Sequence, residues 1–303
     1  MSPGIAVGPA ADESWMSAAV REAGGTQAPL AEADALIWYG TASDLAPVLK
    51  AAPNVRWIQL PAAGVEDYLA LMDGGDRIWT AAKGVYANPC AEHALGLAIA
   101  GFRHMDAGAR SPGWRKLPGK TLFGANVVVV GGAGGIGQAL LRLLKPFGVN
   151  ATSVRRRSEP TPGADRTVAP EDFMGTLGDA DLVVLAAPLT SETESMFAEA
   201  QLRAMKNDAW LVNVARGRLV KTDDLVKALV ERWIGGAGLD VTDPEPLPAE
   251  HPLWRLDNCI ITSHTANPPN LDQQLYRRRI VENVRRFLRG QPLIGVVDPR
   301  AGY

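Results

Sequence analysis

Three kinds of reactive side chain follow apolar runs of the sequence. Arg216 lies just beyond AWLVNV (209–214), Asp240 and Glu245 lie at and beyond the end of GGAGLDV (235–241), and His264 follows CIITS (259–263). Ligands of parallel α/β sheets bind beyond the carboxyl ends of the strands. An arginine can hold a carboxylate and polarise a carbonyl, a histidine can give a proton, and a carboxylate can keep that histidine protonated. The pattern predicts chemistry on a carbonyl beside a carboxylate.

A glycine-rich loop follows four consecutive valines, Val127 to Val130, and leads into the helical pattern QALLRLLKPFG. Gly132, Gly134 and Gly137 fit the dinucleotide-binding pattern, and Gly135 and Ile136 complete the loop. In that pattern the glycines allow a tight turn, close approach of the backbone to a pyrophosphate, and close packing of helix on strand. The loop predicts dinucleotide binding, with an ordinary turn between strand and helix as the alternative.

The stretch VRRRS (154–158) follows the next expected strand, where binders of NAD carry an acidic residue for the ribose hydroxyl. Three arginines stand there instead: Arg155, Arg156 and Arg157. Guanidinium groups donate charge-assisted hydrogen bonds to a phosphate. We therefore predict that NADP is preferred and NAD is possible, unless the arginines form only a solvated basic turn.

Elements that could position these residues are visible as short apolar runs alternating with helical spacing, a pattern typical of α/β proteins with parallel sheets. Asn88 and Pro89 predict the start of a long helix that ends before SPGWRKLPGK (111–120). A second helix is indicated by an apolar stripe closed by Gly290, comprising Tyr276, Ile280, Val284 and Phe287.

Composition narrows the class of protein. The 303 residues suggest two domains, and 31 basic against 33 acidic side chains give a net charge of −2, which argues against nucleic acid as a partner. The arginines of the last helix are interpreted as a solvated face. No apolar run predicts a membrane span, and Cys90 and Cys259 form no metal or disulfide pattern. We expect a cytoplasmic protein without a metal.

The sequence resembles the D-isomer-specific 2-hydroxyacid dehydrogenases, in particular their NADP-preferring branch similar to glyoxylate/hydroxypyruvate reductases. The matching stretches cover residues 121–264 in the family's order: VVVVGGAGGIGQALLRLLKPFG, APLTSETESMF, LVNVARGRLV, GLDVTDPEPLP with HPLW, and NCIITSH. The first ninety residues match weakly, through PAAGVEDY (61–68) and ANPCAEHALGLAIA (87–100).

The resemblance implies a Rossmann doubly wound parallel sheet (residues 94–267) and a smaller flavodoxin-like α/β substrate domain (residues 1–93, completed by 268–303). It also implies a homodimer and a cleft that closes around the substrate. The activity implied is hydride transfer between NAD(P)H and a 2-oxo acid, which gives a D-2-hydroxy acid.

The resemblance also assigns roles to residues. Arg216 would bind the substrate, His264 would be the acid/base, and Glu245 would pair with His264. Asp240 would contact the nicotinamide carboxamide. Pro188 and Thr193 would line the cofactor site, and the backbone amides of Ala63 and Gly64 would hold the substrate carboxylate.

Some questions stay open at the level of sequence. Ser263 replaces the family's proline, and the residues after His264 differ from its glycine-rich version, so the particular 2-oxo acid is not predicted. His93, His104 and His251 are interpreted as structural. A second hypothesis is a dinucleotide-sensing regulatory protein of the same fold that binds without turnover.

Overall fold

The computed structural model describes residues 3–9, 13–72, 75–157 and 159–303. The chain forms two compact units, one of residues 1–86 with 269–303 and one of residues 87–268. The sequence placed this division after residue 93, inside the helix α3 (Ala87–Phe102). The structure assigns the whole helix to the second unit because it packs against α5, β10 and β11 there.

The first unit is built on a parallel sheet of five strands in the order β2-β1-β3-β4-β5. Its strands are β1 (Gly4–Gly8), β2 (Thr26–Gln27), β3 (Ala35–Trp38), β4 (Trp57–Gln59) and β5 (Ile78–Thr80). Its helices are α1 (Glu13–Glu22), α2 (Ala42–Lys50), the 3-10 helices η2 (Leu30–Glu32) and η3 (Glu66–Leu71), and the long α9 (Pro269–Leu288). Apolar side chains on both faces of the sheet require these helices as cover.

The two faces of this sheet have separate cores. On one face, Leu36, Trp38 and Ile58 pack with Leu45 of α2 and Tyr68 of η3. On the other face, the strands pack against α1 and α9, through a set that includes Ile5, Ile37, Trp57, Met16, Val20, Tyr276, Ile280 and Val284. The C-terminal helix predicted from its apolar stripe is thus a structural part of the first unit, and Gly290 follows it at a φ of 63°.

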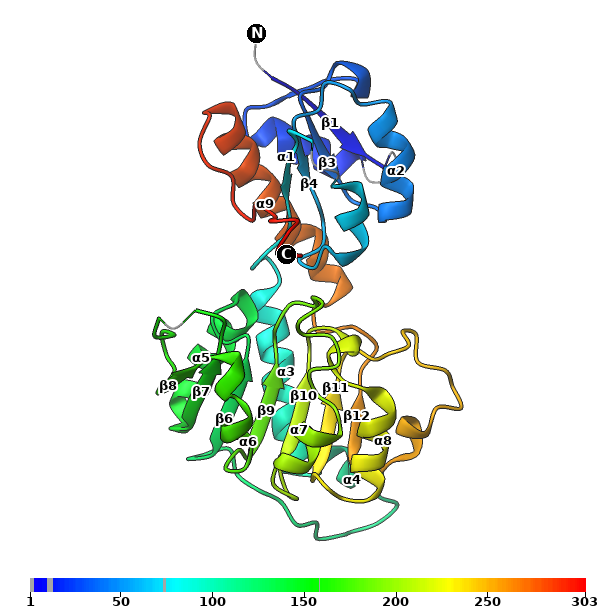
Figure 1. Ribbon diagram of the computed structural model, residues 1–303. Coiled ribbons are helices and arrows are strands. Elements are labelled where there is room, and N and C mark those ends of the chain that lie inside the picture. Colours follow the sequence, from blue (N-terminus) through cyan, green and yellow to red (C-terminus); the bar gives the residue numbers. More distant parts are fainter. Residues whose placement is uncertain (1–2, 10–12, 73–74, 158) are drawn as a thin grey trace. The chain divides into compact units, whose positions relative to one another are not determined.

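The second unit contains a parallel sheet of seven strands in the order β12-β11-β10-β9-β6-β7-β8 (Figure 1). The strands are β6 (Asn126–Val130), β7 (Asn150–Val154), β8 (Arg166–Val168), β9 (Leu182–Leu185), β10 (Trp210–Asn213), β11 (Gly236–Leu239) and β12 (Cys259–Ile261). The first strand, β6, lies inside the sheet, with the strands that follow it divided between its two sides. This doubly wound order confirms the predicted Rossmann fold and places the switch point between β6 and β9.

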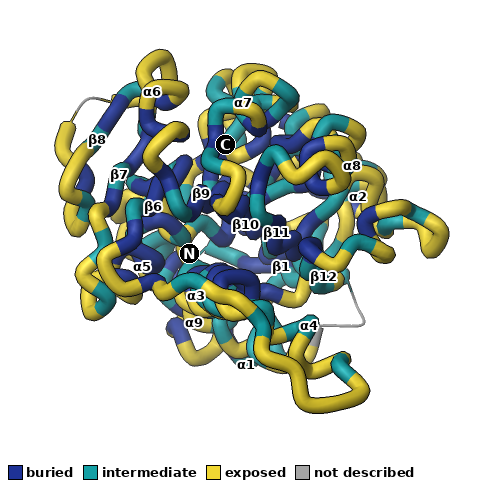
Figure 2. Tube along the Cα trace, turned by 90° about the horizontal axis from the view of Figure 1, so that it is seen from below, coloured by how far each residue is buried: buried dark blue, intermediate teal, exposed yellow. Residues whose placement is uncertain are grey.

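Helices cover both faces of this sheet. One face packs against α3 and α5 (Gly135–Leu144), and the other packs against α6 (Met174–Leu177), α7 (Glu199–Ala204) and α8 (Thr222–Val230). The short helix α4 (Met105–Ala109) follows α3, and the 3-10 helices are η4 (Lys145–Phe147), η5 (Pro170–Asp172), η6 (Gly217–Leu219) and η7 (Pro252–Arg255). The central strands β9, β10 and β11 are buried throughout, as their dark blue traces show (Figure 2). The sheet is therefore a rigid base for the loops at its edges.

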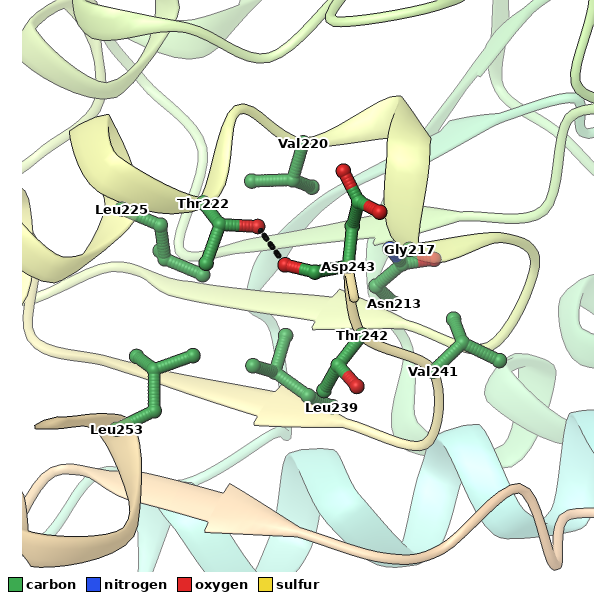
Figure 3. Close-up of a pocket in the computed structure, with 10 residues that line it drawn as sticks. All are labelled: Asn213, Gly217, Val220, Thr222, Leu225, Leu239, Val241, Thr242, Asp243 and Leu253. Carbon is green, nitrogen blue, oxygen red and sulfur yellow. Dashed lines mark hydrogen bonds between the residues drawn. The ribbon is translucent and has the colours of Figure 1, made fainter. Parts of the chain in front are cut away.

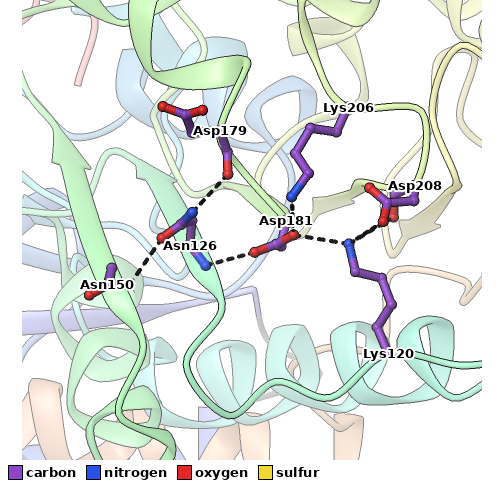
Figure 4. Close-up of polar contacts among 7 residues, drawn as sticks. All are labelled: Lys120, Asn126, Asn150, Asp179, Asp181, Lys206 and Asp208. Carbon is purple, nitrogen blue, oxygen red and sulfur yellow. Dashed lines mark hydrogen bonds and ion pairs between the residues drawn. The ribbon is translucent and has the colours of Figure 1, made fainter.

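A cluster of charged side chains connects the amino ends of β6, β9 and β10 (Figure 4). Asp181, just before β9, accepts hydrogen bonds from Lys206 Nζ at 2.5 Å, the backbone N of Asn126 at 2.9 Å and Lys120 Nζ at 3.0 Å. Lys120 also pairs with Asp208 at 2.9 Å. Burial raises the pKa of Asp181, but the hydrogen bonds from Lys206, Asn126 and Lys120 outweigh burial and hold the pKa at about 2.

Candidate active site

The candidate reactive residues follow three neighbouring strands of the second unit. Asn213 of β10 lies beside Leu239 of β11, and Leu239 lies beside Ile261 of β12. Arg216, Glu245 and His264 therefore leave the same carboxyl edge of the sheet, three, six and three residues beyond the ends of β10, β11 and β12.

His264 and Glu245 form a close pair at this edge. Nδ1 of His264 lies 2.5 Å from Oε1 of Glu245, and both side chains are about half exposed. The other carboxylate oxygen of Glu245 accepts a hydrogen bond from the backbone N of Thr242 at 3.4 Å. This contact fixes the orientation of the imidazole ring.

Asp240 holds the backbone on which His264 lies. Its side chain is only 1% exposed. Oδ1 accepts from the Thr262 hydroxyl at 2.6 Å and the backbone N of Thr265 at 2.9 Å, and Oδ2 accepts from the backbone N of Ala266 at 3.0 Å. The family resemblance implies a contact of Asp240 with nicotinamide, which stays a prediction. In the structure its hydrogen bonds order the loop after β12.

Arg216 is positioned by the end of its own strand. The side-chain amide of Asn213 donates to the carbonyl of Arg216 at 2.9 Å, and its oxygen accepts from the backbone N of Ala215 at 3.1 Å. The guanidinium Nη1 donates to the carbonyl of Ala215 at 2.7 Å. These contacts fix the turn that carries the arginine, so its side chain extends from an ordered base.

The segments that carry Arg216 and Glu245 are packed directly on each other. A Cβ added to Gly217 would lie 1.9 Å from the carbonyl oxygen of Thr242, so only glycine fits there. The same two segments line a small pocket, across which the Thr222 hydroxyl donates to the carbonyl of Asp243 at 2.6 Å (Figure 3). This backbone packing therefore fixes the segment that carries Arg216 relative to the segment that carries Glu245.

The glycine loop has the form of a dinucleotide cradle. A Cβ at Gly132 would lie 2.3 Å from Oγ of Ser153, and one at Gly137 would lie 2.5 Å from the carbonyl oxygen of Gly131. Gly134 precedes α5, so the amides of Gly135, Ile136 and Gly137 form its first turn. The first amides of a helix have no intrahelical acceptor and attract phosphate. These residues fit the pyrophosphate of a dinucleotide.

The arginines that follow β7 differ in their surroundings. Arg155 is tied to Glu159, with Nη2 lying 3.2 Å from the carboxylate and Nη1 donating to the Glu159 carbonyl at 3.1 Å. Arg156 lies 4.0 Å from Glu192, and both Arg156 and Arg157 are exposed. Ser158, the last residue of the stretch, lies outside the described residues. Because the ion pair with Glu159 is made by Arg155, the exposed Arg156 and Arg157 can approach a ribose phosphate without breaking it.

Pro188 and Thr193 lie together in the loop after β9. The Thr193 hydroxyl donates to the carbonyl of Pro188 at 2.7 Å and accepts from the backbone N of Thr190 at 2.8 Å. Because β9 flanks β6, this loop is next to the glycine loop, and a Cβ at Gly131 would lie 2.6 Å from the carbonyl oxygen of Ala186. Both residues thus lie at the switch point.

Ala63 and Gly64 belong to the first unit, in the loop after β4. The loop is fixed by the Tyr86 hydroxyl, which donates to the Pro61 carbonyl at 2.8 Å, and by the backbone N of Ala82, which donates to the Ala62 carbonyl at 2.8 Å. Within the described parts of the chain, the amides of Ala63 and Gly64 donate to no backbone carbonyl. Such paired amides suit an anion.

His93 was interpreted from the sequence as structural, but it lies beside the site. Its Nε2 is 2.9 Å from the Thr262 hydroxyl and 3.4 Å from Oδ1 of Asp240. No sequence pattern links a histidine in a helix to a residue 169 positions away, so only the fold reveals the contact. Cys90, one helical turn earlier, is near the same residues: burial and the charge of Asp240 raise the pKa of its thiol to about 11, and Arg216 opposes them.

The other two histidines lie elsewhere. His104 packs edge-on against Trp210, and Nδ1 of His251 accepts from the backbone N of Leu253. Within the described ranges, no three His, Cys, Asp or Glu side chains are grouped to hold a metal ion. In the same part of the chain, no helix has the length and apolar character that crossing a membrane requires.

A Rossmann sheet with a glycine cradle at its switch point, and a histidine–carboxylate pair at the same edge, defines a dinucleotide-dependent oxidoreductase. The model of the D-isomer specific 2-hydroxyacid dehydrogenase family, NAD binding domain, matches residues 94–266. The chain belongs to this family.

Named relatives agree with this assignment. The chain is 34% identical to a glyoxylate reductase of Thermofilum pendens, over 85% of this chain and 79% of that protein. Among the solved structures that match 100% of both chains are the following two. A D-isomer specific 2-hydroxyacid dehydrogenase of Xanthobacter autotrophicus in complex with NADPH and MES has a TM-score of 0.87 at 26% identity. An NADPH-dependent glyoxylate/hydroxypyruvate reductase of Sinorhizobium meliloti in complex with NADP and sulfate has a TM-score of 0.84 at 25% identity.

Proposed function

We propose that this oxidoreductase reduces a small 2-oxo acid to the D-2-hydroxy acid with NADPH, and that His264 gives the proton. The observation that carries the proposal is the 2.5 Å contact of His264 Nδ1 with Glu245, at the strand edge from which Arg216 also extends. With Nδ1 directed to the carboxylate, Nε2 is the ring nitrogen that can meet a substrate oxygen.

Each residue has a defined part in the reaction. Arg216 binds the substrate carboxylate and draws charge toward the carbonyl oxygen. His264 donates its proton to that oxygen, and Glu245 stabilises the charged imidazole beforehand. A bound dihydronicotinamide supplies the hydride for the carbonyl carbon. We further propose the amides of Ala63 and Gly64 as donors to a substrate carboxylate, and the glycine loop as the binding site of the dinucleotide.

The substrate class is supported by the names of relatives, which are glyoxylate and hydroxypyruvate reductases. Glyoxylate and hydroxypyruvate carry the carboxylate and adjacent carbonyl that this set of groups suits. We therefore propose a small 2-oxo acid of this kind as the substrate, and a D configuration for the product, as in the family's description.

NADP is the proposed preferred cofactor, and the basic turn after β7 is the reason. A carboxylate at this place would repel a ribose phosphate, whereas guanidinium groups donate to it. The glycine cradle and the first turn of α5 would hold the pyrophosphate, and Asp240, Pro188 and Thr193 would adjoin the nicotinamide half. Two structural relatives contain NADPH or NADP.

The first experiment measures NADPH oxidation with a panel of 2-oxo acids. We expect turnover with glyoxylate or hydroxypyruvate, and a kcat about 10²- to 10⁴-fold lower for His264→Ala, the range typical of a lost general acid. His251→Asn is the matched control, since an asparagine can retain the contact with Leu253, and it should keep wild-type activity. Tight NADPH binding without turnover of any 2-oxo acid would favour the dinucleotide-sensing alternative.

The second experiment measures the affinities for NADPH and NADH by tryptophan fluorescence. We expect at least about tenfold tighter binding of NADPH, equivalent to about 1.4 kcal/mol. Changing both exposed arginines to alanine (R156A with R157A) should remove this margin and leave the NADH affinity unchanged. Arg155→Asp tests the arginine held by Glu159. Equal affinities in the wild type would show that VRRRS is only a solvated turn.

A homodimer is proposed as the assembly, following the family resemblance. The segment after α3 exposes Met105, Trp114 and Phe123, apolar side chains that a second copy could cover. Light scattering should give twice the chain mass of 32.3 kDa, and a single-chain mass would refute the dimer.

A further inference from the structure

A chain of hydrogen bonds runs from helix α3 to the loop that carries His264. Nε2 of His93 lies 2.9 Å from Oγ1 of Thr262, and Oγ1 lies 2.6 Å from Oδ1 of Asp240. His93 belongs to α3, Thr262 follows β12, and Asp240 follows β11, so the chain connects three elements of the second unit.

The available protons determine which group donates each hydrogen bond between His93, Thr262 and Asp240. The Asp240 carboxylate can only accept, so the single hydroxyl proton of Thr262 is used toward it. The Thr262 oxygen must then accept from His93, which requires a proton on Nε2 of that ring. His93 therefore prevents the Thr262 hydroxyl from turning away, and polarises its bond to Asp240.

Asp240 in turn fixes the backbone around His264 through hydrogen bonds. Its two oxygens accept from the amides of Thr265 and Ala266, and its own carbonyl accepts from the amide of His264 at 2.8 Å. His264 has a φ of 51°, in the left-handed region that residues other than glycine rarely adopt. Such a conformation persists only where its surroundings fix it.

We propose that His93 is a positioning residue for proton transfer, which acts through Thr262 and Asp240 to hold His264 in its left-handed conformation against Glu245. The inference rests on the proposed function of His264, because it concerns how that residue is oriented. His93 itself is not assigned any contact with the substrate or the dinucleotide.

The kinetic test compares His93→Leu with His93→Gln. Glutamine can place an amide N–H near the position of the imidazole Nε2–H, whereas leucine has no donor. We expect His93→Leu to lower kcat about tenfold, because small misplacement of a catalytic group is costly. The KM for the 2-oxo acid and the Kd for NADPH should change by less than about twofold, and the solvent deuterium isotope effect on kcat should rise. His93→Gln should recover most of the lost rate.

His104→Asn serves as the control, since His104 lies in the same unit without a contact to Asp240, and asparagine tolerates its left-handed φ of 47°. It should leave kcat and the isotope effect unchanged. A His93→Leu enzyme with wild-type kcat would overturn the proposal. So would a loss of thermal stability and rate that His93→Gln does not relieve, since that result indicates packing alone.

A double-mutant cycle tests the series arrangement. Thr262→Val removes the middle link while keeping the shape of the side chain. If His93 acts through Thr262, the variant with both changes should have a kcat within about twofold of Thr262→Val alone. Losses that multiply would show that His93 acts by another route and would overturn the proposal.

A spectroscopic measurement separates failure of this inference from failure of the proposed function. The chain has only four histidines, so the ring nitrogen signals of His264 can be assigned by substitution in long-range ¹H–¹⁵N spectra. We expect these signals to move in His93→Leu and Thr262→Val but not in His104→Asn. Unmoved signals would refute the positioning role even if the wild type reduces 2-oxo acids, and moved signals would support it even if the wild type reduces none of those tested.

Discussion

Glu245 and His264 are nineteen positions apart in the sequence, yet their side chains share a 2.5 Å contact. The pair is half exposed, so water competes for both groups until a substrate covers them. We propose that the charge of Glu245 supports His264 as the proton donor of the reaction. The charge of Glu245, rather than its size, is therefore the property that the proposed reaction needs.

The change Glu245→Gln tests this point, because glutamine preserves the shape and removes the charge. We expect kcat for reduction to fall about 10²-fold at saturating NADPH, with the NADPH affinity unchanged. Glu250→Gln, an exposed change in the same loop, is the control and should behave as wild type. If Glu245→Gln keeps its kcat, the pair has no part in proton transfer.

The sequence could predict that the candidate residues Arg216, Glu245 and His264 lie beyond strand ends, because each follows an apolar run. It could not predict the place of His93. Nothing in the local sequence distinguishes His93 from the other polar residues of α3. Its partners are Thr262 and Asp240, and only the packing of α3 on the sheet brings them near. Contacts of this kind depend on the helix rotation, which local sequence does not specify.

Among the elements, the contact of η6 with the loop after β11 decides whether the site is assembled. Gly217 opens η6, and its Cα approaches the backbone of Thr242 so closely that no side chain fits. The loop beyond Thr242 carries Glu245, and the residue before Gly217 is Arg216. A displacement at this contact would separate Arg216, the proposed substrate-binding residue, from Glu245.

Gly217→Ala is expected to lower the free energy of unfolding by about 1–3 kcal/mol, as overpacking does, and to lower kcat/KM more than tenfold. Gly96→Ala is the matched control: Gly96 lies in α3 with nothing within 4 Å of its added Cβ. That change should stabilise the helix by up to about 1 kcal/mol and leave activity intact. Urea denaturation and steady-state rates measure both, and equal behaviour of the two variants would contradict the argument.

The continuous apolar strands were predictable, including β12 at an edge of its sheet, whereas the edge strands β2 and β8 were not. The runs that became β6, β9 and β10 are continuous and apolar because both faces of the sheet are covered. In contrast, β2 has two exposed residues and β8 begins with an exposed arginine. Such strands form because a neighbour offers hydrogen bonds, so their sequence carries little signal. The helix α3 also begins at Ala87, before the predicted Asn88 cap.

In the second unit as a whole, the carboxyl ends and the amino ends of the parallel strands carry different kinds of side chain. The carboxyl edge carries the candidate chemistry, and the amino edge is tied by Asp181 with Lys120 and Lys206. A carboxylate whose pKa is held at about 2, below its usual 3.8, stabilises the fold above pH 3.8 and loses that contribution as the pH falls toward 2.

Asp181→Asn should therefore reduce the stability difference between pH 6 and pH 3 by about 0.5–1 kcal/mol, because a carboxylate with a pKa of about 2 is still mostly ionised at pH 3 and solvent screening weakens its ion pairs. Denaturant titrations at both pH values measure it, with catalytic rates at pH 7 expected to stay near wild type. Asp257→Asn, which removes an exposed pair with Arg232, is the control and should not alter the pH dependence. An unchanged pH dependence in Asp181→Asn would refute the assigned role.

The division of the first unit between the two ends of the chain has a consequence for synthesis on the ribosome. Residues 1–86 emerge first, but Tyr276, Ile280 and Val284, which cover one face of their sheet, belong to α9. At about 5–20 residues per second, that cover follows about 10–40 seconds later. The second unit is continuous and can close its own core in the interval. Residues 1–86 thus obtain their full cover only after the second unit has been made, and until then the face that α9 covers is open to nascent-chain chaperones.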